Sequence, residues 1–72
     1  MKIIDSLGAR CPLPIIATAK AMKELNTGDS LVLLADDPAT EPDLKAWARM
    51  TGNKVEVIGP AKFKVSKLVS ND

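Results

Sequence analysis

Apolar residues recur first at strand-like and then at helix-like intervals in the opening third of this 72-residue chain. Residues 2–5 are expected to form a short strand, and a glycine-containing loop leads from it to a helix over 12–25. The apolar residues at helical spacing, which should face the core, are Ile15, Ala19, Met22 and Leu25. Gly28 follows this pattern and indicates that the helix has ended.

A continuous apolar run over 31–35 predicts a central strand that is buried on both faces. The next helix could begin with Asp37 or with Thr40 as its cap. Pro42 favours the later start, because a proline inside a helix removes a hydrogen bond. The apolar face of this helix should carry Leu44, Trp47, Ala48 and Thr51. Residues 54–58 alternate as a half-exposed strand, and a last strand follows the Gly-Pro turn behind them.

The predicted order of elements is βαβαββ within one domain, residues 1–72. A strand–helix–strand crossover is nearly always right-handed, so the first two strands should be parallel and both helices should cover the same face of the sheet. The sequence therefore predicts a two-layer α/β (α+β) sandwich.

Charge and composition narrow the class of protein. Ten Lys and Arg residues against nine Asp and Glu residues give a net charge of +1, which argues against direct nucleic-acid binding. Four lysines and one glutamate fall within 54–67, and we interpret this run as a solvated strand face rather than a patch for a partner. The chain has no histidine, so a typical zinc or iron site would need carboxylates and one thiolate alone, and no metal is expected. No other cofactor is expected either.

A single cysteine, Cys11, cannot form a disulfide within the chain, which fits a reducing compartment. The sequence contains no visible signal peptide or membrane-spanning segment, so the expected location is the cytoplasm. A domain this small has no room for a deep enclosed active site, and any site should lie on the surface at the end of an element.

Cys11 stands between a loop and the first helix, at or near the N-cap of that helix. The partial positive charge of the helix N-terminus and the adjacent Arg10 should lower the pKa of the thiol. Pro12 and Pro14 fall in the first turn, where a missing N–H costs least. They leave the N–H of Leu13 as the donor best placed for the sulfur. The alternative is that Cys11 is a small buried hydrophobic residue, the common fate of a lone cysteine.

What the chain lacks narrows the chemistry open to Cys11. Without histidine there is no general base for a Cys–His hydrolase, and without a C-x-x-C pair there is no dithiol cycle. There remains a single activated sulfur that one protein loads and another unloads. A persulfide suits that role, because its terminal sulfur is both nucleophilic and transferable.

Two groups of residues are expected near Cys11. Asp36 and Asp37 follow the second strand, and the ends of parallel strands meet at one edge of a sheet. They could hold the cysteine loop or contact a partner, or one of them could only cap the second helix. The outer face of the first helix, a candidate docking patch, carries Leu13, Ile16, Ala17 and Lys20. Ordinary scattered exposure of apolar residues is the alternative for that face.

Residues 5–14, DSLGARCPLP, resemble the D-x-x-G-x-x-C-P-x-P signature of the TusA/SirA-like sulfur carriers. The similarity continues at Gly28-Asp29, Asp36-Asp37-Pro38, Asp43, Trp47 and Thr51-Gly52. The resemblance implies a mixed four-stranded sheet and a C-P-x-P cysteine, here Cys11, that receives sulfane sulfur as a persulfide. It implies a carrier with sulfurtransferase-type persulfide transfer rather than an enzyme with independent turnover.

The resemblance also implies partners. A cysteine desulfurase or a rhodanese would donate sulfur, and a DsrE-like relay protein would accept it for tRNA thiolation, sulfur oxidation or cofactor assembly. Two positions depart from the family pattern. Asn53 stands where members often have histidine, and Leu13 stands where members that serve tRNA thiolation have glutamate. The pathway that the chain serves therefore stays open.

A small non-catalytic RNA-binding or regulatory module is the alternative function, since folds of this family resemble the C-terminal domain of a bacterial translation initiation factor. The near-neutral charge, the scarcity of aromatic residues (one Phe and one Trp) and the position of Cys11 disfavour it. Persulfide formation on Cys11 would separate the two functions.

Overall fold

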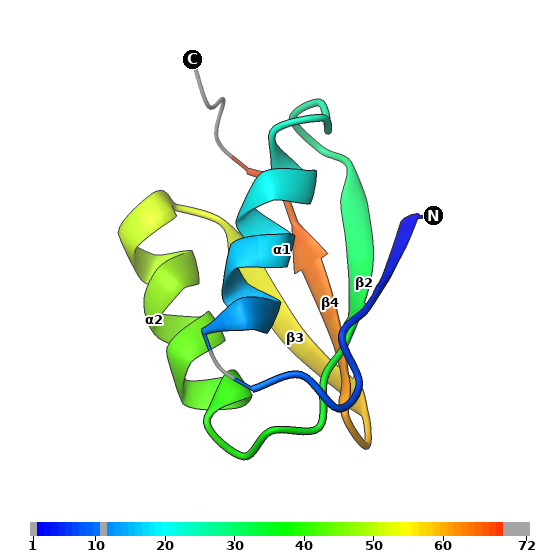
Figure 1. Cartoon of the computed structure of the whole chain (residues 1–72). Helices are drawn as coiled ribbons and strands as arrows, with labels where there is room; N and C mark the ends of the chain where they lie inside the picture. Colours follow the sequence, from blue (N-terminus) through cyan, green and yellow to red (C-terminus); the bar gives the residue numbers. More distant parts are fainter. Residues whose placement is uncertain (1, 11, 69–72) are drawn as a thin grey trace.

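Four strands form one sheet and two helices lie across one face of it in the computed structural model, which describes residues 2–10 and 12–68 (Figure 1). In chain order the elements are β1 (Lys2–Asp5), α1 (Leu13–Met22), β2 (Ser30–Leu34), α2 (Thr40–Thr51), β3 (Lys54–Gly59) and β4 (Lys62–Ser66). The sheet order is β1-β2-β4-β3. β1 and β2 are parallel, and the other two pairs are antiparallel, so the sheet is mixed. The predicted two-layer α+β sandwich is confirmed.

The core lies between the sheet and the two helices. Its buried apolar side chains are Ala21, Met22, Leu31, Leu33, Ala35, Leu44, Phe63 and Val65. Trp47 packs against this cluster while staying partly exposed. Burying one leucine or valine side chain contributes about 1.5–3 kcal/mol. The same burial fixes the register of the strands, because a slip of one residue would turn Leu31 and Leu33 away from the helices.

β2 lies at the centre of the sheet, as predicted, but it is buried on one face only. Leu31 and Leu33 are fully buried under the helices, whereas Val32 between them is half-buried on the opposite face. The register places Val32 in one row with Ile3 of β1 and Lys64 of β4. The prediction of burial on both faces is wrong because both helices cover the same face, and no other described element covers the second one.

The buried face of α1 also differs from the prediction. The residues of α1 that are buried are Pro14, Thr18, Ala21 and Met22. Ile15 and Leu25 pack at the margin of the core, and Ala19 is half-buried. Thr18 tolerates burial because its hydroxyl donates a hydrogen bond to the carbonyl oxygen of Pro14 at 2.9 Å. Apolar residues surround most of α1, so their spacing alone does not select the face that packs.

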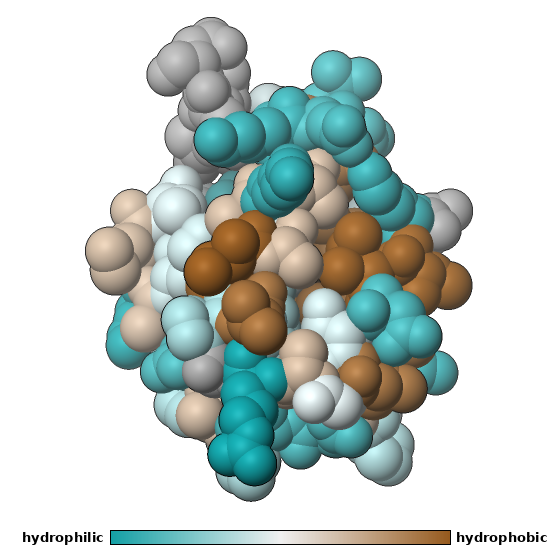
Figure 2. Space-filling model, in the orientation of Figure 1, coloured by the Kyte–Doolittle hydropathy of each residue, from teal (hydrophilic) through white to brown (hydrophobic). Residues whose placement is uncertain are grey.

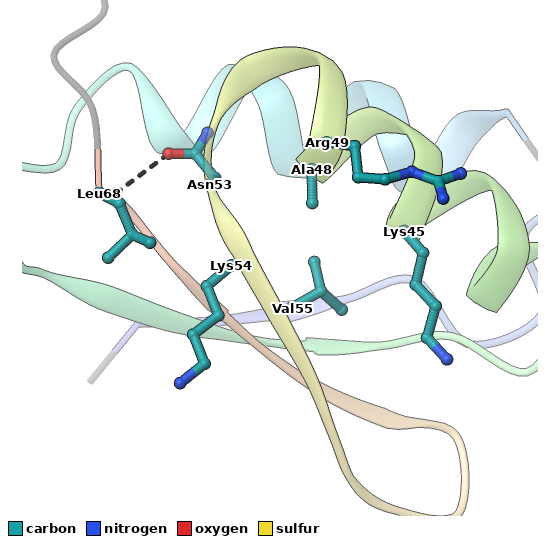
Figure 3. A pocket seen from close by; sticks show the side chains of 7 residues that line it. All are labelled: Lys45, Ala48, Arg49, Asn53, Lys54, Val55 and Leu68. Atoms are coloured by element: carbon teal, nitrogen blue, oxygen red, sulfur yellow. Dashed lines mark hydrogen bonds between the residues drawn. The ribbon is translucent and has the colours of Figure 1, made fainter.

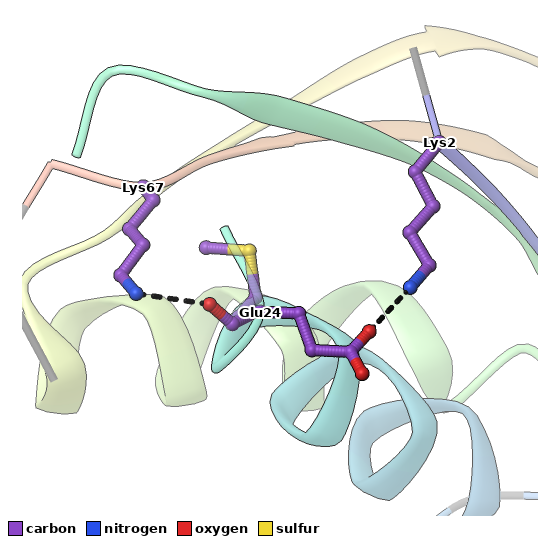
Figure 4. Close-up of polar contacts among 4 residues, drawn as sticks. Lys2, Glu24 and Lys67 are labelled. Atoms are coloured by element: carbon purple, nitrogen blue, oxygen red, sulfur yellow. Dashed lines mark hydrogen bonds and ion pairs between the residues drawn. The ribbon is translucent and has the colours of Figure 1, made fainter. Parts of the chain in front are cut away.

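α1 ends at Met22, whereas the pattern predicted a helix to residue 25. The ammonium group of Lys67 donates hydrogen bonds to the carbonyl oxygen of Met22 at 3.0 Å (Figure 4) and to that of Leu25 at 2.6 Å. In a longer helix the N–H of Asn26 would bond to the carbonyl of Met22. Here that N–H bonds to Oδ2 of Asp29 at 3.1 Å. The carbonyl of Met22 thus bonds to Lys67 and the N–H of Asn26 bonds to Asp29, so the hydrogen bond between them that would continue the helix does not form.

α2 begins at Thr40, the later of the two predicted starts, which confirms the inference drawn from Pro42. The N-cap is Ala39 rather than Thr40. Its N–H donates to Oδ1 of Asp37 at 2.8 Å, and the N–H of Thr40 donates to the carbonyl oxygen of Asp37 at 2.9 Å. The helix ends at Thr51, and its C-cap is Gly52, whose φ of +79° lies in the left-handed region that favours glycine.

Candidate functional site

Residues 6–10 form the loop that runs from β1 toward the motif cysteine, and backbone hydrogen bonds give this loop a defined shape. The N–H of Ser6 donates to the carbonyl oxygen of Leu34 at 2.8 Å, which continues the pairing of β1 with β2. The N–H of Ala9 donates back to the carbonyl oxygen of Ser6 at 3.1 Å. The turn passes through Gly8, whose φ of +83° is a conformation that other residues rarely adopt.

Asp36, which follows β2, anchors this loop with its side chain. Oδ1 of Asp36 accepts a hydrogen bond from the N–H of Gly8 at 3.0 Å. Asp37 instead supports the start of α2, where its Oδ1 accepts from the N–H of Ala39. The loop before α1 and the segment before α2 accordingly lie side by side at one end of the molecule (Figure 1). Of the arrangements that the sequence left open, the bond to the cysteine loop occurs at Asp36, whereas Asp37 bonds within the turn before α2 and is not its N-cap.

Pro12 occupies the N-cap position of α1, and Pro14 is buried in the first turn. The N–H of Leu13 donates to the carbonyl oxygen of Arg10 at 2.9 Å. That N–H is therefore already engaged, contrary to the expectation that it would be the donor for the sulfur. Cys11, which the sequence analysis placed at or near the N-cap, lies outside the described residues, between Arg10 and Pro12 in the chain.

The electrostatics of the helix start favour an anion in this segment. Residues 13–16 include no acidic side chain, so the partial positive charge of the N-terminus of α1 is not neutralised there. The exposed side chain of Arg10 adds a full positive charge close by in the chain. Such surroundings stabilise a thiolate relative to a thiol.

The outer face of α1 is exposed at three of its four predicted positions, and Ala17 is half-buried. Leu13 is 58% exposed and Ile16 is 56% exposed, and Lys20 lies further along the same helix with its side chain in solvent. Figure 2 shows hydrophobic side chains gathered over α1 on the face turned toward the viewer. Ala17 and Lys20 also line a shallow groove of about 260 Å³ between α1 and β1, whose floor includes Ile4. Lys2 and Glu24, which form an ion pair, line the same groove, so the apolar surface of α1 is interrupted by charge where it meets β1.

Asn53, which departs from the family pattern, lies at the opposite end of α2 from the cysteine loop. Its Oδ1 accepts a hydrogen bond from the N–H of Leu68 at 3.2 Å, and its Nδ2 donates to Oγ1 of Thr51 at 3.0 Å. The side chain is almost fully buried. Asn53 therefore ties the segment after β4 to the end of α2, and it takes no part in the site around Asp36 and Gly8.

Within residues 2–10 and 12–68, no group of three or more His, Cys, Asp or Glu side chains is placed to hold a metal ion. Neither helix in that part of the chain combines the length and the apolar composition needed to cross a membrane.

Comparison with known proteins identifies the family. The family described as "Sulfurtransferase TusA" matches residues 2–67, so this chain belongs to the TusA family. The SirA-like protein of Desulfitobacterium hafniense has the same fold, with a TM-score of 0.75 and 31% identity over 90% of this chain and 92% of that one.

Two proteins of Bacillus subtilis (strain 168), YrkI and YrkF, are named as candidate sulfur carriers. Each is 42% identical to this chain over 52 residues, which are 72% of the chain. The matched segment spans 69% of YrkI but only 28% of YrkF. The chain is thus similar to proteins that are named as sulfur carriers.

Proposed function

We propose that the chain carries sulfane sulfur as a persulfide on Cys11 and passes it to a second protein in a sulfur relay. The observation that carries the proposal is the position of the only thiol of the chain. Cys11 belongs to a C-P-x-P motif and directly precedes the N-cap of α1, in a chain of the TusA family. A lone cysteine in a core strand would not support this function.

The transfer needs no redox partner. The thiolate of Cys11 attacks the terminal sulfur of a donor persulfide, the S–S bond of the donor breaks, and the donor cysteine leaves as a thiolate. The proton of the terminal sulfur stays with it or is exchanged with water. In the second step an acceptor thiolate attacks the terminal sulfur on Cys11, which is then released as a thiolate. The sulfane sulfur keeps its oxidation state throughout.

Arg10 and the N-terminus of α1 would stabilise the anionic forms of Cys11, the thiolate and the persulfide. Pro12 and Pro14 would set the start of α1, with Pro14 fixed by burial in the first turn. Asp36 would hold the preceding loop through Gly8. Asp37 would fix the neighbouring start of α2 and so shape the rim beside the sulfur.

The donor protein would dock on the outer face of α1. Leu13 and Ile16 offer exposed apolar area within one turn of each other, and Lys20 adds a positive charge at the far end of the same face. The donor that we propose is a cysteine desulfurase or a rhodanese, and the acceptor is a DsrE-like relay protein. The pathway would be tRNA thiolation, sulfur oxidation or cofactor assembly, and the location would be the cytoplasm.

Intact-mass spectrometry tests the proposal. The protein is mixed with a cysteine desulfurase and cysteine, and the expected product is heavier by one sulfur atom, which a reducing agent removes. Cys11→Ser is the matched control, because serine can also stand at a helix start. We expect this variant to fold and to gain no sulfur. If the wild type gains no sulfur with any donor, the alternative of an RNA-binding or regulatory module is favoured instead.

A further inference from the structure

An open groove of about 450 Å³ lies between α2 and β3, away from the cysteine loop (Figure 3). Its apolar floor consists of Ala48 from α2, Val55 from β3 and Leu68 from the segment after β4. The amide of Asn53 at one end of the groove is already bonded to Leu68 and to Thr51. That amide therefore shapes the groove rather than offering free donors to a ligand.

Three cationic residues line the groove, from two sides of β3: two on α2, and one whose side chain points to the uncovered face of the sheet (Figure 3). Lys45 and Arg49 lie one turn apart on α2, and Lys54 is the first residue of β3. No acidic residue is among the described residues that line the groove. Lys45 pairs with Glu41 at 2.8 Å and Lys54 lies 3.6 Å from Glu56, but both pairs are exposed. Exposed pairs are weak, so their cations can exchange a local carboxylate for one on a ligand.

Arg49 is the cation best placed to act as an anchor. Its guanidinium has no ion-pair partner within the part of the chain that the structure describes, and the residue is exposed. A guanidinium can bind a carboxylate through two parallel hydrogen bonds, whereas an ammonium offers a point charge. The groove therefore presents one free bidentate donor and one further positive charge on the side of α2, with the charge of Lys54 on the other face of β3.

β3 gives the groove a second property, because it is an edge strand of the sheet. β3 pairs only with β4 among the described strands. In an antiparallel pair, alternate residues of an edge strand direct their backbone N–H and C=O groups away from the neighbouring strand. Val55 and Lys54 belong both to this free edge and to the lining of the groove. The unpaired backbone N–H and C=O groups of β3 thus lie next to the groove, at the same edge of the sheet.

We infer that this groove and the free edge of β3 bind an extended acidic segment of a partner protein, which adds to the sheet as a further strand. Its backbone would pair with β3, an apolar side chain would fill the floor, and its carboxylates would meet Arg49, Lys45 and Lys54. A second copy of this chain is disfavoured, because its β3 offers one glutamate, Glu56, beside one lysine, Lys54, and so has little negative charge to meet the cations of the groove. RNA is disfavoured because no aromatic side chain lines the groove for base stacking.

Titration with a blocked peptide of glutamate residues with valine at every fourth position, which places carboxylates on both faces of an added strand, tests the inference independently of any sulfur on Cys11. We expect amide chemical-shift changes in ¹⁵N-labelled protein to centre on residues 54–59 and on the end of α2. We also expect about half of the β3 amides to gain protection from hydrogen exchange. Affinity should fall as salt is raised. A peptide with lysine in place of glutamate should not bind.

The double variant Lys45→Gln/Arg49→Gln should bind the acidic peptide about tenfold more weakly. The matched control is Lys62→Gln/Lys64→Gln, which removes the same charge from the uncovered face of the sheet and should bind within about twofold of the wild type. Thermal melts establish that both variants are folded. Equal weakening by the two double variants would overturn the inference, as would shift changes centred on another surface. Stronger binding of an oligouridine than of the acidic peptide at the groove, or self-association through β3, would also overturn it.

Discussion

The backbone N–H of Gly8 and the carboxylate of Asp36 are joined by a hydrogen bond of 3.0 Å, across two segments that lie 28 positions apart in the chain. This bond connects the loop before Cys11 to the end of the central strand. Since Gly8 already holds a left-handed backbone conformation, the bond selects one shape of the loop out of the many that a glycine permits. The rigid sheet thereby positions the approach to the motif cysteine.

Asp36→Ala should leave the fold intact and slow persulfide loading of Cys11. One exposed hydrogen bond contributes about 0.5–1.5 kcal/mol, so the variant should melt only slightly earlier than the wild type. Asp29→Ala is the control, because Asp29 is also exposed and also accepts a backbone hydrogen bond, from Asn26, in the turn that precedes β2. Denaturant melts and a loading time course would separate the variants. Equal loading rates for the two would show that the Gly8–Asp36 bond does not position the site.

Ile16→Ala should change the unfolding free energy by no more than about 0.5 kcal/mol, because the side chain is 56% exposed. Leu33→Ala, a fully buried residue, should cost about 2–5 kcal/mol. If the outer face of α1 receives the donor, Ile16→Ala should nevertheless accept sulfur more slowly. A stable variant that loads at the normal rate would remove Ile16 from the docking surface without affecting the role of Cys11.

Lys67→Met should destabilise the protein by about 1–3 kcal/mol, because it removes the side-chain donor to the carbonyl oxygen of Leu25 and one of the two donors to that of Met22. Methionine keeps the length of the buried stem. Lys23→Met, at an exposed position just after α1, should stay within about 0.5 kcal/mol of the wild type. Urea denaturation gives both values. A Lys67→Met variant as stable as the wild type would mean that the cost of burying the ammonium offsets its two hydrogen bonds.

The Lys2–Glu24 pair should contribute a pH-dependent part of the stability. The hydrogen bond from the ammonium of Lys2 at 2.7 Å, and its positive charge, lower the pKa of the Glu24 carboxyl below the ordinary value for glutamate (Figure 4). A carboxyl whose pKa is lower in the folded state stabilises the fold above its unfolded pKa, about 4.3. This contribution is lost as the pH falls through the folded value.

Glu24→Gln should therefore be less stable than the wild type near neutral pH. This difference in unfolding free energy should shrink as the pH is lowered below about 4. Lys2→Gln should remove the same pH dependence, since it deletes the other partner. Molar salt should weaken the effect, because both side chains are largely exposed. Melts across acidic pH at low and high salt would measure it. A stability difference that stays constant with pH would show that the pair does not form in solution.

Most of the fold could be predicted because its signals are local. The proline at position 42 selected the start of α2, and Gly52 marked its end, since both act through the backbone of their own segment. The parallel pairing of β1 with β2 followed from the handedness of the crossover between them. The position of Asp36 at the end where the cysteine loop lies followed from the same topology.

Side-chain environments were less predictable, because they depend on partners that are distant in the chain. Lys67 belonged to a lysine run that we interpreted as solvated, yet it is 5% exposed and bonds to the end of α1. Lys45 and Arg49 were not singled out, and Lys54 belonged to the same lysine run that we interpreted as solvated. The only sequence signal for Lys45 and Arg49 was their one-turn spacing, which is common on exposed helix faces.

The sequence by itself determined the order of the elements, the class of fold and the motif that contains Cys11, because periodicity, prolines, glycines and crossover handedness act over short distances. Only the tertiary structure decided which face of α1 is buried and which aspartate bonds to Gly8. It also decided that the cations of α2 and β3 meet around one groove. These outcomes depend on the packing of one sheet face against two helices, where each side chain is placed by neighbours from other elements.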